Sequence, residues 1–154
     1  YHKKFGLNYP ILRYGSLYGP RSQNWNGIRR FAQQITENGF VEYEGDGSEI
    51  REYIHVSDAA NLSIKVLDDS YKNKALTITG QQSIKISDML AMLFEIIGKK
   101  IKIKYSSNNI KTFHYGNTPY RYKPKASMKM VPTEYVDLGQ GLLDIVEEVS
   151  TKSK

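Results

Sequence analysis

The chain has 154 residues, 40% of them hydrophobic and 25% charged, with a formal net charge of +6, which fits one soluble compact domain or a piece of a larger one. It has no cysteine, so neither disulfides nor thiolate metal sites are available; this fits a cytoplasmic setting, and we expect no metal centre. No apolar run could span a bilayer and the basic residues are scattered, so we expect neither a membrane nor a nucleic acid as partner.

The first predicted elements suggest a chain that begins inside a larger fold. Residues 1–5 read as the last turn of a helix, with Gly6 as its C-cap and basic residues in that turn. Because a protein seldom begins with the end of a helix, we interpret the chain as a fragment. A short strand is predicted over 9–14, and a long polar loop, of a kind that is often functional, over 15–26.

Helices and strands alternate through the rest of the chain. Apolar residues at helical spacing predict helices, and β-branched or alternating runs predict strands. The predicted elements are, in order, a helix over 27–38, strands over 40–43 and 50–56, a helix over 59–67, a strand over 75–79, a helix from Ser87 to Gly98, a strand over 101–105 and a helix over 142–149. Two helices are expected to have N-caps at 57–58 and at Ser87. The pattern over 106–135 is irregular, and the tail over 150–154 is expected to fray.

Arg51 raises the main chemical question in the sequence, because it lies in an otherwise apolar strand. A buried charge needs a partner. That partner is either an internal carboxylate, Asp46 or Glu52, or a phosphate. His55 in the same strand is expected to be a packed histidine with a satisfied hydrogen bond, not a catalytic group or a metal ligand.

Aromatic residues leave a second question open. Core packing is the expectation for Trp25 and Phe31. For the tyrosines at 115, 120 and 122, packing within a loop layer and stacking on a ligand are about equally favoured.

Two stretches of the chain, taken together, resemble a known family. The first runs from Leu12 to Arg21 and the second from Gly45 to Asp58. In this order and at this separation they are similar to the extended short-chain dehydrogenase/reductase family of NAD-dependent nucleotide-sugar epimerases and dehydratases. The resemblance covers about residues 1–105 and is weaker from 106 onward.

The resemblance implies an α/β fold that is the C-terminal portion of an extended short-chain dehydrogenase/reductase. It would comprise the last Rossmann strands and a small mixed α/β substrate-binding domain, without the N-terminal dinucleotide-binding half. Residues 1–154 would then be a single fragment, in which 1–14 and about 50–80 complete the missing Rossmann domain. The family's Gly-rich loop and its Tyr-x-x-x-Lys pair would precede residue 1, so no catalytic residue is expected here.

The resemblance also assigns contacts residue by residue. Two positions match the nicotinamide side of the cofactor site, Tyr14 and Leu17. The positions that match substrate contacts are Ser16, Asn26, Gly27, Glu42, Tyr43, Arg51, Tyr53 and Arg121. Among these, Arg51 matches a diphosphate-binding arginine, whose planar fork suits phosphate oxygens. Glu42, Tyr43 and Glu44 match the strand that cradles the base through its backbone.

The function implied is substrate binding within an NAD(P)-dependent nucleotide-sugar epimerase or dehydratase. The full-length protein would transfer a hydride through a keto-sugar intermediate and would be a homodimer. NAD or NADP would be bound mainly by the missing domain, the ligand here would be a nucleotide-diphosphate sugar, and the fragment alone would be inactive. The alternative is a non-catalytic nucleotide-sugar-binding or protein-interaction domain that kept the fold. A weaker alternative is an RNA-binding relative, which steep salt-dependent RNA affinity would indicate.

Overall fold

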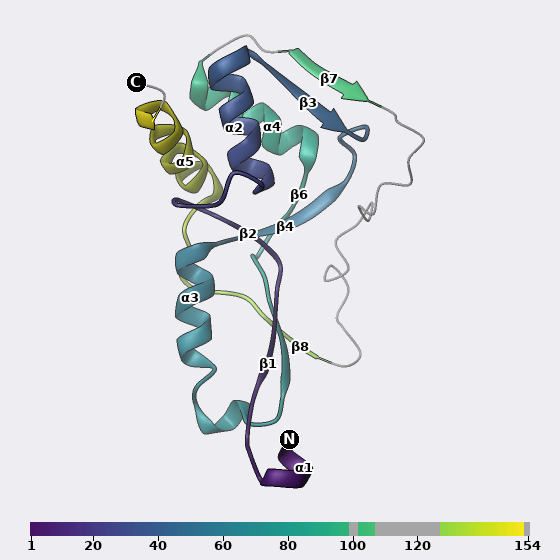
Figure 1. Ribbon diagram of the computed structural model, residues 1–154, viewed down its shortest axis with the longest axis vertical. Helices are drawn as coiled ribbons and strands as arrows, with labels where there is room; N and C mark the ends of the chain where they lie inside the picture. Colours follow the sequence, from purple (N-terminus) through teal and green to yellow (C-terminus); the bar gives the residue numbers. More distant parts are fainter. Residues whose placement is uncertain (99–101, 107–126, 153–154) are drawn as a thin grey trace.

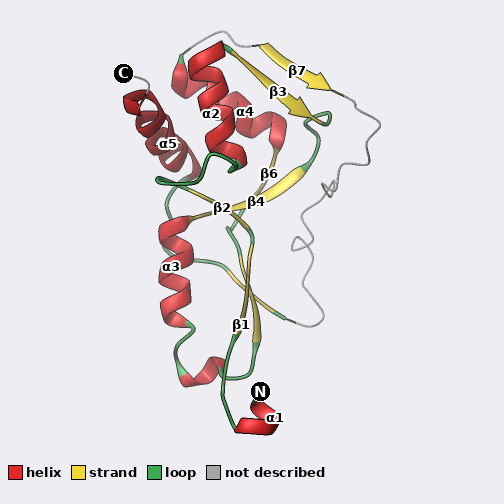
Figure 2. Cartoon of the chain, in the orientation of Figure 1, coloured by secondary structure: helices red, strands yellow, loops and turns green. Residues whose placement is uncertain are grey.

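The computed structural model describes residues 1–98, 102–106 and 127–152, and it is elongated (Figure 1). The helices are α1 (His2–Phe5), α2 (Gly27–Asn38), α3 (Val56–Lys65), α4 (Ile86–Ile97) and α5 (Leu138–Lys152), with a 3-10 turn at Asp69–Tyr71. The strands are β1 (Ile11–Tyr14), β2 (Ser16–Tyr18), β3 (Phe40–Glu44), β4 (Ile50–His55), β5 (Ala75–Ile78), β6 (Ser83–Lys85), β7 (Lys102–Ser106) and β8 (Met128–Met130). The mixture of helices and strands is the predicted α/β class (Figure 2).

One end of the molecule, here called the sheet end, consists of β1, β5, β8 and α3. The strands form a parallel sheet in the order β1-β5-β8, with Leu12 opposite Leu76 and Leu76 opposite Met128. The helix α3 packs along this sheet (Figure 1). Its buried cluster consists of Ile54, Ala59, Leu62, Val66, Leu76, Ile78 and Met130.

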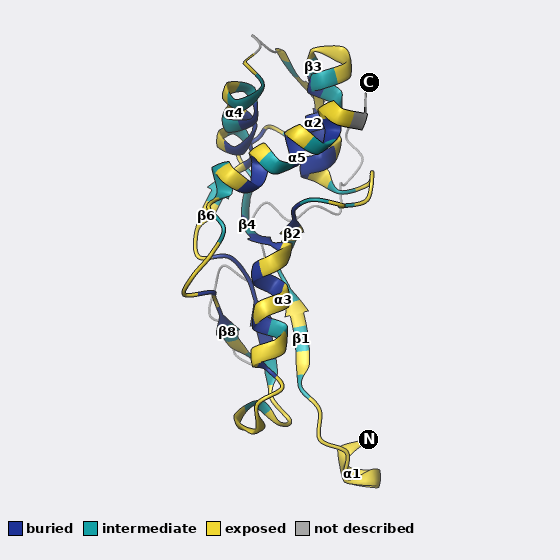
Figure 3. Ribbon diagram, turned by 90° about the vertical axis from the view of Figure 1, so that its left-hand side faces the viewer, coloured by how far each residue is buried: buried dark blue, intermediate teal, exposed yellow. Residues whose placement is uncertain are grey.

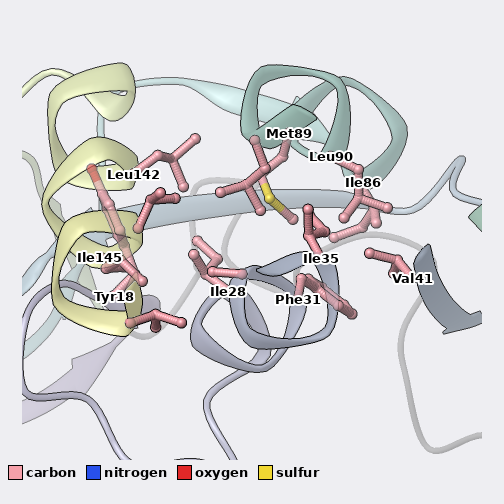
Figure 4. Close-up of a cluster of buried hydrophobic side chains, with 14 of the residues drawn as sticks. Tyr18, Ile28, Phe31, Ile35, Val41, Ile86, Met89, Leu90, Leu142 and Ile145 are labelled. Carbon is pink, nitrogen blue, oxygen red and sulfur yellow. The ribbon is translucent and has the colours of Figure 1, made fainter. Parts of the chain in front are cut away.

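The opposite end, here called the helical end, consists of α2, α4 and α5 with the parallel pair β3 and β7. The three helices bury side chains against one another, and Val41 from β3 joins them (Figure 4). Ile35, Leu90 and Leu142 have no exposed surface. Burying a side chain of this size stabilises the fold by roughly 1.5–3 kcal/mol, so the helical end has a core of its own. Figure 3 colours the residues by burial, and the helices of the helical end have both buried and exposed residues.

A small sheet in the order β2-β4-β6 joins the two ends. β2 runs parallel to β4, with Ser16 opposite Tyr53, and β6 runs antiparallel to β4. Two glycines permit the close crossing of chain segments here. A Cβ at Gly15 would lie 2.8 Å from the hydroxyl of Thr79, and a Cβ at Gly80 would collide with the carbonyl oxygen of Tyr53.

Several predicted boundaries are confirmed. α1 ends at Gly6 with φ 66°, and α2 covers the predicted 27–38 and ends at Gly39 with φ 71°, the left-handed conformation that glycine adopts without strain. Gly98 ends α4 in the same way. Phe31 is 4% exposed, so its predicted core position is also confirmed.

Other predictions about the elements are wrong. The predicted loop over 15–26 contains strand β2, and the region predicted to be irregular contains β8. α3 begins at Val56, earlier than expected, because the ring of His55 and not Ser57 or Asp58 caps it. Ser87 is not an N-cap either, because β6 leads directly into α4. α5 begins at Leu138 and continues through Lys152, so residues 150–152 are helical and not frayed.

Candidate functional site

A pocket with an empty volume of about 940 Å³ lies between the start of α2, strands β2 and β4, and the end of β3. We call it the α2 pocket. It is lined by Ser16, Leu17, Trp25, Asn26, Gly27, Ile28, Arg30, Phe31, Tyr43, Glu44, Arg51, Tyr53 and Ile86. It combines aromatic and aliphatic walls with a few polar groups that come from separate parts of the sequence.

The N-terminus of α2 forms one side of this pocket. The side-chain oxygen of Asn26 accepts a hydrogen bond from the Arg29 backbone N–H at 3.4 Å, and its amide nitrogen donates to the Leu17 carbonyl at 2.9 Å. Asn26 therefore both caps the helix and fixes it to β2. The first amides of a helix have no intrahelical acceptor and carry a partial positive charge. This arrangement favours an anion beside Gly27.

Arg51 and two tyrosines form the opposite wall. The Nη1 group of Arg51 donates to the Ile50 carbonyl at 3.0 Å, and Tyr53 lies two residues further along β4 on the same face. Burial raises the pKa of both Tyr43 and Tyr53, and the positive charge of Arg51 opposes that rise. Glu49 raises the pKa of Tyr43 further, by its charge and by a hydrogen bond. Both phenols therefore stay protonated and can donate hydrogen bonds.

The two carboxylates that the sequence suggested as partners of Arg51 bind other groups. Asp46 accepts a hydrogen bond from the Ser48 backbone N–H at 2.8 Å within its own turn. Glu52 is 4% exposed and binds the Lys129 ammonium at 2.8 and 3.0 Å and the Thr79 hydroxyl at 3.1 Å. Glu52 is thus paired with Lys129, and Asp46 is hydrogen-bonded within its own turn.

Most of the predicted contact residues meet in the α2 pocket. They are Ser16, Leu17, Asn26, Gly27, Tyr43, Arg51 and Tyr53. Glu42 does not line it; its carboxylate faces Lys104 at 3.8 Å on an exposed surface. Tyr14 turns toward α3, where its hydroxyl is 2.6 Å from that of Ser63. Arg121 and the tyrosines at 115, 120 and 122 lie outside the described residues.

The pocket also contains residues that sequence reasoning missed. The prediction that Trp25 packs in the core is wrong, because it is 81% exposed and lines the pocket. Trp25 lies in a long polar loop, which offers no apolar partner for its ring. This sequence context could have indicated that the ring is exposed. Arg30 was also missed. It lies four residues after the N-cap Asn26, so helical spacing places the two on one face. Glu44 is the anionic side chain of the lining.

His55 has a structural role at the junction of β4 and α3. It is 5% exposed, and its Nδ1 accepts a hydrogen bond from the Ser57 backbone N–H at 3.3 Å. The prediction of a packed histidine is confirmed. Its hydrogen bonding is only half satisfied, because the buried Nε2 has no partner among the described residues. Burial lowers the pKa of His55, against the opposing charges of Asp58 and Asp144.

A second pocket, with an empty volume of about 690 Å³, lies beyond Tyr53. Its lining includes Tyr18, His55, Asp58 and Tyr135. Tyr53 is the one predicted contact residue in it, so we place the candidate site in the α2 pocket.

In the described part of the chain, no helix is both long enough and apolar enough to cross a membrane.

Comparison with known proteins gives consistent matches. The model of the NAD dependent epimerase/dehydratase family matches residues 1–78. A UDP-glucuronate 4-epimerase of Thermodesulfobacterium geofontis (strain OPF15) is 30% identical over 105 residues, which are 68% of this chain and 32% of that protein. A dTDP-4-dehydro-6-deoxy-D-allose reductase of a Streptomyces species is 24% identical over 108 residues, 68% of this chain and 33% of that protein.

Solved structures share the fold. The UDP-glucuronic acid 4-epimerase of Bacillus cereus, in complex with UDP-glucuronic acid and NAD, matches with a TM-score of 0.83 and 20% identity. The match covers 98% of this chain and 48% of that one. The chain therefore spans about a third of the length of these curated relatives and about half the length of this solved structure.

Proposed function

Because the chain belongs to the NAD dependent epimerase/dehydratase family, we propose that it is the substrate-binding part of an enzyme that modifies nucleotide-diphosphate sugars. The reaction class is epimerisation, dehydration or reduction, as in the relatives named above. One observation carries the proposal. Seven residues matched to substrate or cofactor contacts, from β2, the start of α2, β3 and β4, converge in the α2 pocket.

The proposed anion site is the space between Arg51 and the first turn of α2. A guanidinium donates in a planar fork that matches phosphate oxygens, and charge-assisted hydrogen bonds of this kind are about twice as strong as neutral ones. The amides at the start of α2 supply donors on the other side, and Gly27 itself carries no side chain. Together they would hold the diphosphate and fix the direction of the rest of the ligand.

The remaining walls suit the base and the sugar. Tyr43 is 8% exposed and packs edge-on against Phe31, with ring centroids 5.9 Å apart, so it offers a rigid apolar surface. Ser16 lies opposite Tyr53 in the β2–β4 pair, which brings two hydroxyl groups to the same side of the pocket. We assign these hydroxyls to the sugar diphosphate.

The family implies NAD or NADP, and the residues present fit one edge of such a cofactor. Leu17 is 40% exposed at the pocket and offers an apolar contact for a nicotinamide ring, whereas the Tyr14 side chain is held against α3. The 154 residues contain no Gly-x-Gly-x-x-Gly loop for the cofactor pyrophosphate. When bound, NAD would accept a hydride from a sugar carbon. These residues would hold and orient the sugar, and alone they would not complete the transfer.

The test is ligand binding and turnover by the whole encoded protein with UDP-, dTDP- and ADP-sugars. We expect one of these to bind, and Arg51→Ala to raise its KM by about ten- to a hundredfold, since a charge-assisted phosphate contact is worth roughly 1.5–3 kcal/mol. Arg21→Ala is the control, because Arg21 is exposed and does not line the pocket. An unchanged KM in Arg51→Ala would return Arg51 to a structural role. Binding without any turnover would favour the non-catalytic alternative.

A further inference from the structure

Two guanidinium groups from different elements line the α2 pocket, Arg51 from β4 and Arg30 from α2. Among the described lining residues, Glu44 is the one acidic residue, and it is exposed. We propose that Arg30 binds the second phosphate of the nucleotide diphosphate, so that Arg30 and Arg51 form a two-arginine clamp. This inference rests on the proposed function. The resemblance gave Arg121, which lies outside the described residues, as a weaker candidate for a second phosphate contact, and it assigned no contact to Arg30.

The position of Arg30 is fixed by the ring beside it. Its guanidinium carbon Cζ lies 5.4 Å from the ring centroid of Phe31. Phe31 is 4% exposed and is held in turn by the edge of Tyr43. A guanidinium that lies over an aromatic face keeps the N–H groups at its edge available for hydrogen bonds in its own plane. Phe31 therefore serves as a platform that orients Arg30 at the pocket wall.

The neighbouring arginine has a different role, which makes the assignment specific. Arg29 is 4% exposed and forms an ion pair with Glu148 of α5 at 3.1 Å. The other oxygen of Glu148 accepts a hydrogen bond from the Arg21 backbone N–H at 2.7 Å. Arg29 thus anchors α2 to α5, and Glu148 also holds the loop before α2. Arg30, one position on and so about 100° further around the helix, lines the pocket and is exposed.

The charge of the ligand calls for a second cation. A diphosphate carries charge on both phosphoryl groups, and one arginine can form a two-pronged contact with only one of them. The amides at the start of α2 add partial charge only. Arg30 lies one turn beyond the N-cap Asn26, on the same helix that offers those amides. A diphosphate beside Gly27 would therefore have Arg51 on one side and Arg30 on the other.

The only tryptophan of the chain gives a direct readout of binding. Trp25 lines the pocket and is 81% exposed, so a ligand that enters changes its fluorescence, and calorimetry can measure the same affinities. The probes are UDP, dTDP, ADP and GDP, and the tightest of these is then compared with its own monophosphate. The protein variants are Arg30→Gln, Arg51→Gln and, as an exposed control outside the lining, Arg21→Gln.

For the diphosphate we expect Arg30→Gln and Arg51→Gln each to weaken binding by about tenfold or more, and Arg21→Gln by less than twofold. The monophosphate can occupy one arm of the clamp, so it should respond strongly to only one of the two substitutions. Arg30→Lys should recover part of the affinity, because it restores the charge without the fork. A circular-dichroism spectrum like that of the unsubstituted protein shows that each variant is folded.

Two results overturn the clamp in distinguishable ways. If Arg51→Gln weakens diphosphate binding and Arg30→Gln matches Arg21→Gln, the clamp is wrong and the proposed function stands. If none of the four nucleoside diphosphates binds the unsubstituted protein, the proposed function fails and the clamp fails with it.

Discussion

The helical end and the sheet end differ in how completely they cover their apolar surfaces. At the helical end α2, α4 and α5 enclose a cluster from which solvent is excluded. At the sheet end Leu12 and Tyr14 of β1 pack toward α3, while Ile11 and Arg13, on the other face of the strand, are exposed. Parallel sheets are usually buried on both faces. The helical end therefore has a core of its own, whereas the described part of the sheet end has a core on one face only.

This difference bears on the candidate site. The α2 pocket draws its residues from α2 and the loop before it, β3, the start of α4 and the joining strands β2 and β4, and from none of β1, β5 and β8. Binding geometry is best preserved on elements that do not open. We therefore expect ligand binding to survive changes that loosen the sheet end, and the predictions below test this contrast.

The largest effect is expected for Leu90→Ala at the helical end, because Leu90 has no exposed surface. Such a cavity should lower the free energy of unfolding by about 3–5 kcal/mol. Leu76→Ala is the matched change at the sheet end, where Leu76 is equally buried. Hydrogen exchange should show that Leu76→Ala opens β1, β5 and α3 while α2 and α4 stay protected. Equal loss of protection at both ends in both variants would mean that the molecule unfolds as one unit.

The next largest effect is expected for Lys129→Met, which removes the cation from the buried carboxylate of Glu52. Glu52 joins β4 to the sheet end through Lys129 of β8 and Thr79. An unpaired buried charge should cost about 2–3 kcal/mol. Adding Glu52→Gln removes that charge and should restore most of the stability measured by urea unfolding. If the double variant is no more stable than Lys129→Met, the loss comes from packing and not from the charge.

A smaller effect is expected for Asn26→Ala at the start of α2. Loss of the side-chain cap should cost about 1 kcal/mol in thermal or urea unfolding. Ser87→Ala is the control, because the structure caps α4 without the Ser87 side chain, and it should change stability by less than about 0.5 kcal/mol. A larger loss in Ser87→Ala than in Asn26→Ala would reverse this assignment of caps.

The smallest effect is expected from the titration of His55, at the junction of the two ends. Burial lowers its pKa in the folded state, so the unfolded chain takes up the proton first as the pH falls below about 6.5. The stabilisation by neutral His55 is complete above that pH and is lost as the pH falls toward the folded-state pKa. The unfolding midpoint should therefore decrease from pH 7.5 to pH 5.5, and the decrease should be smaller in His55→Gln. If the unfolding midpoint decreases equally in both proteins, the pH dependence comes from groups other than His55.

Sequence patterns predicted α2 and the C-terminal end of α4 well because each signal was local. Asn26 and Gly39 stand at the ends of α2, and an apolar face runs between them. Short strands were missed because their pairing is not local. β2 and β8 have three residues each and exist as strands only because β4 and β5 lie beside them. The cap of α3 was misplaced because the ring of His55 supplies it, and histidine is not among the usual capping residues.

The sequence by itself determined the family resemblance, the α/β class and most of the residues that meet in the α2 pocket, because these depend on motif order and local propensity. Only the tertiary structure decided the partners of the charged groups. It placed Glu52 on Lys129, Arg29 on Glu148, and both Arg30 and Arg51 in the lining of one pocket. Each pair joins residues that are far apart in the chain. Arg29 and Arg30, although adjacent, have different surroundings, because packing determines which side of a helix meets which neighbour.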